Sequence, residues 1–486
     1  MPSRLSCFLV LGLVNLQAVF STTSQDDLEQ LFLRVSILER ENAELRKKVE
    51  TLMGQNQKQS STLTAKHSSS AQSHPFKVKT HQNYSYEMLD HTSRINQKQQ
   101  TILDHKASDA IGQGLYVGGS VTPIVDYQKS NRDSKFGYLM RHPTSNNQIG
   151  TNVSEAVIHS AEMNITANFG DNLSAYAEFL YDPEQSFGAG TITALARNQV
   201  QLRKGYLLYG DLNESPYYVA VGKMAVPFGL TDTVNPFTSS TVWHAFGGLA
   251  YSALMGYSKD RWNLRLDAIQ GGAQFRAANV PVGGTSVPSR LNNLAIDVNY
   301  RKDFEDAKSL LFGASFLKGS AYCQDFPIVH FNACTDHNPA YSVYAKFEKG
   351  STLYQAEFAQ TLDEWPGTFN PNPPLNQFSA SKVKSFQIGL RDKRTWSETD
   401  VDLSLEFSRF ESGPSGSPWE RQDQLVLGVS HYLRPSVKLF SELIRVSGFA
   451  PLNFLSGGHI QGQPQITISD RDARSTVLIM GVDAAF

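Results

Sequence analysis

The sequence of 486 residues lacks an excess of charge of either sign. Its 44 Lys and Arg residues stand against 46 Asp and Glu residues, which gives a formal net charge of −2 at pH 7. Binding to nucleic acid depends on a clustered basic excess that neutralises phosphates. We therefore expect no nucleic-acid partner.

The sequence also lacks a long apolar run beyond its amino-terminus. No later segment reaches the about eighteen consecutive apolar residues that indicate a membrane-spanning helix. The amino-terminal run, Cys7 to Phe20, is too short to cross a bilayer, and it follows the positive Arg4. This pattern is typical of a secretory signal, so residues 1–21 are predicted to be a signal peptide that is cleaved at Ser21. An exported protein without a membrane helix is located in the periplasm, the medium or the outer membrane.

Cysteine is scarce, with 3 residues in the chain. Cys7 stands at the start of the amino-terminal apolar run, ahead of the predicted cleavage site, and is misplaced for lipid attachment after cleavage. The other two, Cys323 and Cys334, lie close together in the sequence, and an exported protein favours a disulfide between them. A metal site that adds His330 or His337 is the less favoured alternative. The sequence therefore predicts a disulfide and no metal centre.

Recognisable catalytic motifs are missing as well. The chain has 12 histidines, yet no serine stands in a nucleophile setting such as G-x-S-x-G. A hydrolase would have to use His159 beside Ser160, or His244. We predict that the protein is not an enzyme, with no catalytic residues and no cofactor.

What the sequence does contain is the two-residue period of β-strands, most clearly at its carboxy-terminus, Ser475 to Phe486. Every second residue back from Phe486 is uncharged as far as Thr476, whereas the other face carries Asp483. A strand with lipid on one side and water on the other needs this alternation. A terminal Phe that closes such a strand resembles the recognition signal of bacterial outer-membrane barrels.

About sixteen segments of this kind follow one another from Leu115 onward, and several place charged residues on the face opposite the apolar one. A sandwich core would reject those charges, but a hydrated lumen accepts them. Short turns, as at Gly170-Asp171 and Lys349-Gly350, alternate with long polar loops, as at 225–248 and 271–290. We therefore predict an antiparallel, up-and-down transmembrane β-barrel of about sixteen strands over residues 112–486.

A heptad pattern precedes the barrel. Apolar residues occupy the a and d positions of residues 28–52, apart from Asn42 at one a position. Asn42 favours a parallel alignment in fixed register, because a shifted partner would leave its amide buried without a hydrogen bond. We predict a parallel coiled coil over residues 22–53 that makes the protein a homo-oligomer, with a lone amphipathic helix as the alternative. Residues 54–111 read as a polar spacer in which only a weak helical repeat is visible.

The third long loop carries a short motif, G-K-M-A-V-P-F-G (Gly222 to Gly229) followed by N-P-F (Asn235 to Phe237). This motif resembles the phosphate-selective porins O and P. The order of signal peptide, coiled coil, spacer and barrel is similar to that of the LbtU-type siderophore-uptake outer-membrane porins. The resemblance implies import of a ferric siderophore through a barrel without a plug domain, and a third loop that folds inward and narrows the channel.

Candidate pore-lining and constriction residues follow from the inward positions and from the third loop. They are Arg203, Lys223, Trp243, His244, Phe246, Arg265, Asp267, Asp297, Lys346 and Glu406. Both signs of charge occur among them, which favours a polar channel over a tunnel for phosphate. For Phe246 and Trp243 the alternative role is to pack the loop onto the barrel wall. For Lys223 the alternative is to extend its ammonium toward the membrane surface.

The sequence thus predicts an outer-membrane channel for solute uptake, with the coiled coil in the periplasm. Its expected partners are outer-membrane lipid and a small solute, for which the resemblance points to a ferric siderophore. A general or anion- or phosphate-selective porin is the first alternative, and a structural tether or adhesin is the second.

Overall fold

The computed structural model describes residues 77–90, 92, 97–137, 150–182, 199–270, 291–305, 307–323, 337–396, 399–450, 467 and 469–486. The chain divides into two units, Met1–Pro75 and Phe76–Phe486, and the account below concerns the second. The predicted signal peptide, the coiled coil with Asn42, and Cys334 lie outside the described residues. The coiled coil and the Cys323–Cys334 disulfide therefore stay predictions.

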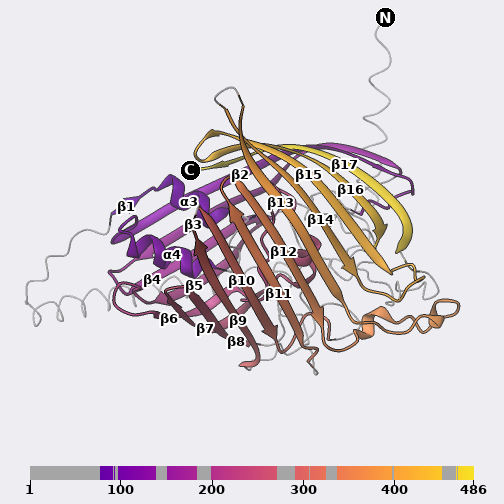
Figure 1. Cartoon of the computed structure of the whole chain (residues 1–486), viewed down its shortest axis with the longest axis horizontal. Helices are drawn as coiled ribbons and strands as arrows, with labels where there is room; N and C mark the ends of the chain where they lie inside the picture. The colour runs from indigo at the N-terminus through magenta and orange to yellow at the C-terminus, as the bar shows by residue number, and fades with distance from the viewer. Residues whose placement is uncertain are drawn as a thin grey trace, which may run out of the picture. The chain divides into compact units, whose positions relative to one another are not determined.

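The strands β2 to β17 form one closed antiparallel barrel (Figure 1). Each strand pairs with the next along the chain, and β17 pairs with β2 from Ser475↔Ser130 to Ala485↔Ser120. The bounds are β2 Gly114–Ser130, β3 Asn152–Asn168, β4 Leu173–Asp182, β5 Gln199–Tyr209, β6 Tyr217–Ala225, β7 Leu249–Lys259, β8 Trp262–Gln270, β9 Leu291–Phe304, β10 Lys308–Leu317, β11 Ala340–Lys349, β12 Thr352–Thr361, β13 Lys384–Trp396, β14 Thr399–Glu411, β15 Arg421–Arg434, β16 Val437–Phe449 and β17 Asp470–Ala485. The predicted barrel and its strand number are confirmed.

Short turns join the strands at one end of the barrel and long loops join them at the other. The predicted turn at Lys349-Gly350 joins β11 to β12, and Gly350 adopts a left-handed φ of 59° that favours glycine. The segments 183–198, 226–248 and 271–290 each join two strands at the long-loop end, as the alternation of connections predicted. In barrels of this type the short turns face the periplasm and the long loops face outward.

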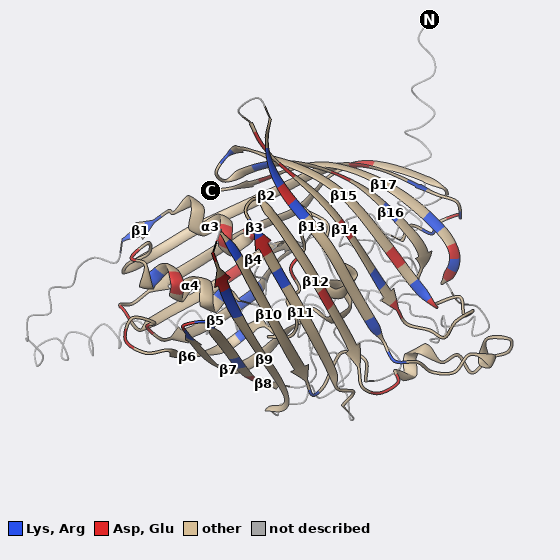
Figure 2. Ribbon diagram, in the orientation of Figure 1, with Lys and Arg blue, Asp and Glu red and all other residues tan. Residues whose placement is uncertain are grey.

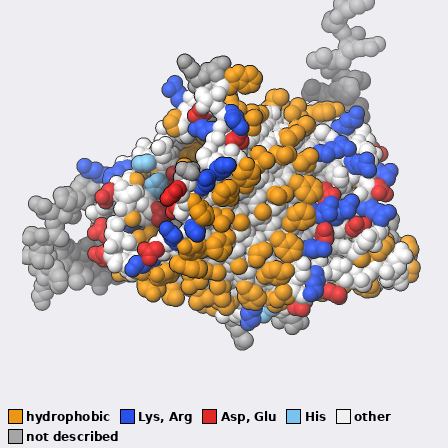
Figure 3. Space-filling view, viewed as in Figure 1, with side chains coloured by type: hydrophobic (Ala, Val, Ile, Leu, Met, Phe, Trp, Pro, Cys, Tyr) orange, Lys and Arg blue, Asp and Glu red, His pale blue; other side chains and the backbone are white. Residues whose placement is uncertain are grey.

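The two faces of the wall differ as the two-residue period predicts. On β3, Met163 is 42% exposed while its neighbour Asn164 is 1% exposed, and on β14 the corresponding values are 39% for Leu405 and 1% for Glu406. Apolar side chains form a continuous band across the outer wall, and charged side chains lie at its margins (Figure 3). A basic side chain at the middle of such a band would cost about 2–4 kcal/mol in a bilayer.

Aromatic side chains form a girdle at each margin of this band. Near the short turns, Trp262 contacts Tyr300 with ring centroids 4.8 Å apart, and Phe347 stacks on Tyr354 at 6.2 Å. Near the long loops, Phe386 contacts Phe407 at 5.8 Å. Aromatic rings favour the level of the lipid headgroups, so the two girdles mark the two surfaces of the membrane. The protein is a transmembrane β-barrel of the outer-membrane type.

A segment ahead of β2 lies inside the barrel at its short-turn end. It comprises β1 (Val78–Lys79), which pairs in parallel with β2, and the helices α3 (Gln82–Leu89) and α4 (Lys98–Ala107). The apolar side chains of the two helices are buried against inward side chains of β2 and β4–β7. That cluster consists of Tyr84, Met88, Ile102, Leu103, Ile111, Tyr116, Tyr176, Tyr206, Leu208, Tyr218, Ala220, Met224 and Leu254. We call residues 77–111 the luminal segment.

The luminal segment corrects two expectations. Its residues were assigned to a polar spacer, and the barrel was expected to have no plug. The weak helical repeat includes Met88 and Ile102, which are 1% and 0% exposed in the structure. The helices contain only a few apolar residues, but the barrel wall supplies the remaining apolar surface. A short amphipathic pattern of this kind is stable only where such a wall covers it.

Three short helices occur in the loops: α5 (Thr241–Phe246) in the third long loop, and η1 (Pro366–Thr368) and η2 (Leu375–Gln377) between β12 and β13. No helix among the described residues is long and apolar enough to cross a membrane.

Candidate functional site

The third long loop, Val226–Gly248, lies inside the barrel, as the resemblance implied. Every residue from 226 to 242 is buried, although the segment is rich in Pro, Thr and Ser. Its α5 helix packs against β12, β13 and β14, on the wall across the lumen from the strands that the loop joins. A loop with this composition is buried only if its backbone donors find partners. Those partners come from the inner wall.

Three glutamates on alternate strands hold the backbone of the third loop. Glu357 on β12 accepts hydrogen bonds from the amides of Leu230 at 2.9 Å and Thr231 at 3.0 Å. Glu442 on β16 accepts from the amides of Phe237 at 2.8 Å and Thr238 at 2.9 Å. Each carboxylate thus satisfies two adjacent backbone donors of the loop.

Glu406 on β14 lies between these two anchors. It accepts from the hydroxyl of Thr233 at 2.7 Å, the side-chain amide of Asn235 at 3.1 Å and the backbone amide of Val234 at 3.3 Å. Hydrogen bonds to a charged group contribute about 1.5–3 kcal/mol each. The three carboxylates together therefore fix the loop across the lumen.

The predicted aromatic residues of the loop serve mainly to pack it. Phe246 is buried and lies 5.8 Å from Phe228 and 5.6 Å from Tyr322. Phe237 stacks on Phe440 of β16 at 4.7 Å. Trp243 and His244 remain half-buried and contact each other edge to face at 4.9 Å. These two are the candidates that keep exposed surface in the loop.

Lys346, another predicted lining residue, anchors the loop from β11. Its ammonium lies 2.8 Å from the carboxylate of Asp232, which is buried in the third loop. The side-chain amides of Gln355 and Gln387 donate to the backbone carbonyl of Asp232 at 2.6 and 2.9 Å. The loop is therefore fixed by a cation as well as by carboxylates.

Arg203 belongs to a charge cluster on β3, β4 and β5. Its guanidinium lies 2.8 Å from Glu162 and 3.6 Å from Glu178. Lys204 also faces inward and lies 2.9 Å from Glu178. Two successive residues point the same way because a register shift between Glu178 and Phe179 leaves Arg203 as an extra residue in β5.

A second cluster holds the predicted residues of β8 and β9. Arg265 lies 2.6 Å from Asp297, and both side chains are buried. Asp297 also accepts from Ser315 at 2.6 Å and from Tyr344 at 2.8 Å. Asp267 is buried two positions further along β8. Acidic and basic residues both occur along the strands of the barrel (Figure 2), and the inward basic side chains described above each lie close to an acidic one.

Lys223 occupies the outer face of β6. It lies on the same face as Val219 and Val221, which are 43% and 60% exposed, and its ammonium lies over the outward ring of Tyr251 at 5.7 Å. The ammonium also donates to the carbonyl of Leu202 at 3.1 Å. The geometry therefore places Lys223 on the outer wall and not among the side chains that face the lumen.

The luminal segment contacts both the wall and the third loop. Tyr84 on α3 is hydrogen-bonded to Thr166 on β3 at 2.6 Å, and Asn263 on β8 donates to Gln100 on α4 at 3.2 Å. The backbone amide of Thr233 in the third loop donates to the carbonyl of Thr92 at 2.9 Å. The two inserted segments therefore meet inside the barrel.

Lys98 is buried in α4 and donates to the backbone carbonyls of Glu87 at 2.5 Å and Asp90 at 3.3 Å. Burial, and then the nearby ammonium of Lys204, lower the pKa of Lys98 to about 8. The hydrogen bonds of Lys98 therefore hold the start of α4 against the end of α3.

Several of these residues were not predicted from the sequence. Lys204 was missed because the register shift reverses the expected alternation in β5. Glu442 was missed because both faces of β16 carry apolar and charged residues, so the face that carries Glu442 could not be identified as the inner one. Asp232 and Thr233 lie in a loop, where no two-residue period predicts which way a side chain points. Among the described residues, no group of three or more His, Cys, Asp and Glu side chains is placed to hold a metal ion.

No family model matches the chain, and no curated protein matches it. Among solved structures, it is similar to an anion-selective porin from Comamonas acidovorans, with 15% identity, a TM-score of 0.46 and coverage of 77% of this chain and 99% of that one. The outer-membrane channel DcaP of Acinetobacter baumannii has 12% identity, a TM-score of 0.46 and coverage of 77% and 98%. OprB of Pseudomonas putida has 10% identity, a TM-score of 0.44 and coverage of 80% and 96%.

Proposed function

We propose that this protein is an outer-membrane channel for solute uptake that conducts when the luminal segment moves. The observation that carries the proposal is the filling of the lumen from two sides. The third loop is anchored to Glu357, Glu406 and Glu442, and the luminal segment is docked on β2–β7. The two meet at Thr92 and Thr233. A barrel of sixteen strands is wide enough for an aqueous channel, so its conductance depends on these insertions.

The occupied lumen favours a selective uptake channel over a general porin. A general porin needs a continuous column of water between the two membrane surfaces. In this barrel the inward side chains of Glu178, Asp297 and Glu406 are 1%, 0% and 1% exposed. This arrangement is compatible with a channel that opens only when a bound ligand displaces one of the inserted segments.

The ligand we propose is a ferric siderophore. Support comes from the order of signal peptide, heptads, spacer and barrel, whereas the G-K-M-A-V-P-F-G and N-P-F motifs resemble the phosphate-selective porins of the alternative. The inner wall supports the same ligand, because its basic side chains are paired with acidic ones and form no continuous basic path along which a simple anion could move. A short helical insertion, smaller than a globular plug domain, agrees with uptake that does not depend on TonB.

Uptake of a radiolabelled ferric siderophore by cells with and without the gene tests the ligand. Loss of uptake on deletion supports the proposal. Unchanged uptake together with lower permeability to small solutes would indicate a general or anion-selective porin instead. Absence of both effects, and of conductance by the purified protein in planar bilayers, would indicate a tether or adhesin.

A cysteine pair tests the moving segment directly. Thr92→Cys with Thr233→Cys places two thiols at the contact between the luminal segment and the third loop. We expect the oxidised protein to conduct less than the reduced protein in planar bilayers. Each single cysteine variant is the matched control and should not respond to oxidation. Equal conductance of the oxidised and reduced double variant would contradict the proposed movement.

A further inference from the structure

A polar pocket opens on the outer wall of the barrel, away from the lumen. It lies at the long-loop ends of β12–β15 and has a volume of about 530 Å³. One register row crosses these four strands, with Gln360↔Lys384, Lys384↔Glu411 and Glu411↔Arg421 as neighbours. The adjacent residues Thr361, Ser385, Phe410 and Gln422 are buried on the inner side. The row therefore faces outward.

Two loops close the pocket above this row. The loop between β12 and β13 contributes Glu364 and Lys382, and the loop between β14 and β15 contributes Glu420 and the backbone around Pro414. The volume is within the range of about 300–1,000 Å³ that suits small ligands.

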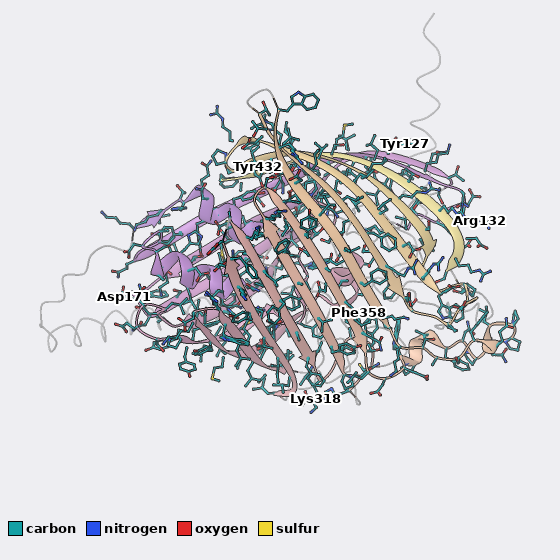
Figure 4. All side chains as sticks on the ribbon, in the orientation of Figure 1. Tyr127, Arg132, Asp171, Lys318, Phe358 and Tyr432 are labelled. Atoms are coloured by element: carbon teal, nitrogen blue, oxygen red, sulfur yellow. The ribbon has the colours of Figure 1, made fainter. Side chains whose placement is uncertain are left out.

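The level of the pocket relative to the membrane is set by aromatic residues directly beneath it. Phe358 and Phe386 are register neighbours, two positions along their strands from Gln360 and Lys384 (Phe358 is labelled in Figure 4). The guanidinium of Arg409 lies 5.9 Å from the ring of Phe386 and 5.8 Å from that of Phe407. Two residues of a strand span about 7 Å. The pocket thus lies immediately outside the aromatic girdle, at the depth of lipid phosphates and sugars.

The cations at this level are held in place by acidic neighbours. Lys384 lies 2.6 Å from Glu411, and Arg409 forms a two-point pair with Asp423 at 2.6 and 3.1 Å. Arg421 lies 3.4 Å from Asp423. Lys384 and Arg421 remain 44% and 47% exposed, and pairs of such exposure contribute at most about 1 kcal/mol each. A phosphate can therefore compete for these cations.

We propose that this pocket binds the headgroup of a phosphorylated glycolipid of the outer leaflet. Lys382, Lys384 and Arg421 bind a phosphate, for which guanidinium and ammonium groups are the usual partners. Gln360, Glu364 and Glu420 accept hydrogen bonds from sugar hydroxyls. The acyl chains of the same lipid then lie on the apolar band below Phe358 and Phe386. A solute in transit does not meet these residues, because they face away from the lumen.

Binding of radiolabelled, bisphosphorylated lipid A to the purified full-length protein in detergent tests this site. We expect saturable binding, with at least tenfold weaker binding of the same lipid without its phosphates and of phosphatidylglycerol, which lacks the sugar. Inorganic phosphate at millimolar concentration should not displace the lipid. Equal binding of any of these lipids, or displacement by phosphate, would overturn the proposal of a glycolipid site.

The double variant Lys384→Gln and Arg421→Gln should weaken lipid A binding at least tenfold. Arg394→Gln is the matched control, since Arg394 lies at the opposite end of β13, is exposed and pairs with Asp392. Unfolding temperature and single-channel conductance should be the same in both variants, which separates this site from the lumen. Wild-type binding by the folded double variant, or an equal loss in Arg394→Gln, would refute the assignment.

Discussion

At the scale of single residues, the inner wall is defined by carboxylates that act on the inserted loop rather than on a passing solute. Glu406 was predicted to line the pore, and it does face inward, but its three donors belong to Thr233, Val234 and Asn235. Lys346 likewise pairs with Asp232 of the loop. A charge on the wall of a barrel therefore does not identify a selectivity filter until the occupant of the lumen is known.

Replacing Glu406 by Ala is expected to loosen the third loop. The change removes the acceptor of three hydrogen bonds in a buried setting, so unfolding should become easier by about 2–5 kcal/mol and the conductance should rise. Thermal unfolding and planar-bilayer recording measure the two effects. Glu348→Ala is the control, because Glu348 is 47% exposed near a short turn, and we expect a change within about 0.5 kcal/mol. Equal effects of the two substitutions would contradict an anchoring role for Glu406.

At the scale of elements, the two luminal helices depend on the barrel wall for their stability. α3 and α4 span Gln82–Leu89 and Lys98–Ala107, which is too short for stable isolated helices in water. Their buried residues include Tyr84, Met88 and Ile102. The helices should therefore undock as a unit when one of these contacts is lost.

Replacing Ile102 by Asp is expected to release the luminal segment. A carboxylate at a site that is 0% exposed, and surrounded by Tyr and Leu side chains, cannot be accommodated without undocking. Proteolysis of the segment should become faster and the open-channel fraction larger. Ser108→Asp, at an exposed position just after α4, should change neither. A closed and protease-resistant Ile102→Asp variant would show that the segment does not block the channel.

Docking of the luminal segment should strengthen as the pH rises from about 8 to about 10. Lys98 is docked with a pKa of about 8, below its ordinary value of 10.5, so the docked state disfavours its charged form. Below pH 8 both states are protonated and the full cost of burying the charge opposes docking. As the pH rises, the docked state loses its proton first and that cost disappears. Lys204, Glu178, Asp90 and Asp232 are the charged groups that act on Lys98.

Conductance as a function of pH measures this effect. The open fraction should fall between pH 7 and pH 10 in the wild type. Lys98→Met removes the titrating group and should flatten the dependence. An identical pH profile in Lys98→Met would assign the titration to another group.

At the scale of the whole molecule, the protein is predicted to assemble through residues 22–53, which the structure does not describe. Asn42 is the residue that specifies the assembly, because a buried amide at an a position is satisfied only by the same residue of a partner chain in register. Replacing Asn42 by Leu should raise the melting temperature of the amino-terminal peptide 22–53 and broaden its distribution of oligomeric states. Analytical ultracentrifugation measures the distribution, and a single unchanged species would contradict the predicted role.

The sequence by itself determined the barrel. Period-two alternation in segments such as 162–169 and 401–408, together with alternating short and long connections, sufficed because lipid and water impose opposite demands on neighbouring side chains. The same local rule assigned Arg265, Asp297 and Glu406 to the inner face correctly. It failed at Lys204, which points inward together with Arg203 because a register shift changes the alternation in β5.

Only the tertiary structure decided what fills the barrel. The luminal segment has few apolar residues of its own, so its helices become stable only through contact with Tyr176, Tyr206 and Tyr218 on distant strands. The third loop is polar by composition, yet it is buried because Glu357, Glu406 and Glu442 converge on its backbone from three strands. Contacts between residues far apart in the chain produce no periodic pattern in the local sequence. They form only when the barrel closes, so the sequence alone does not predict them.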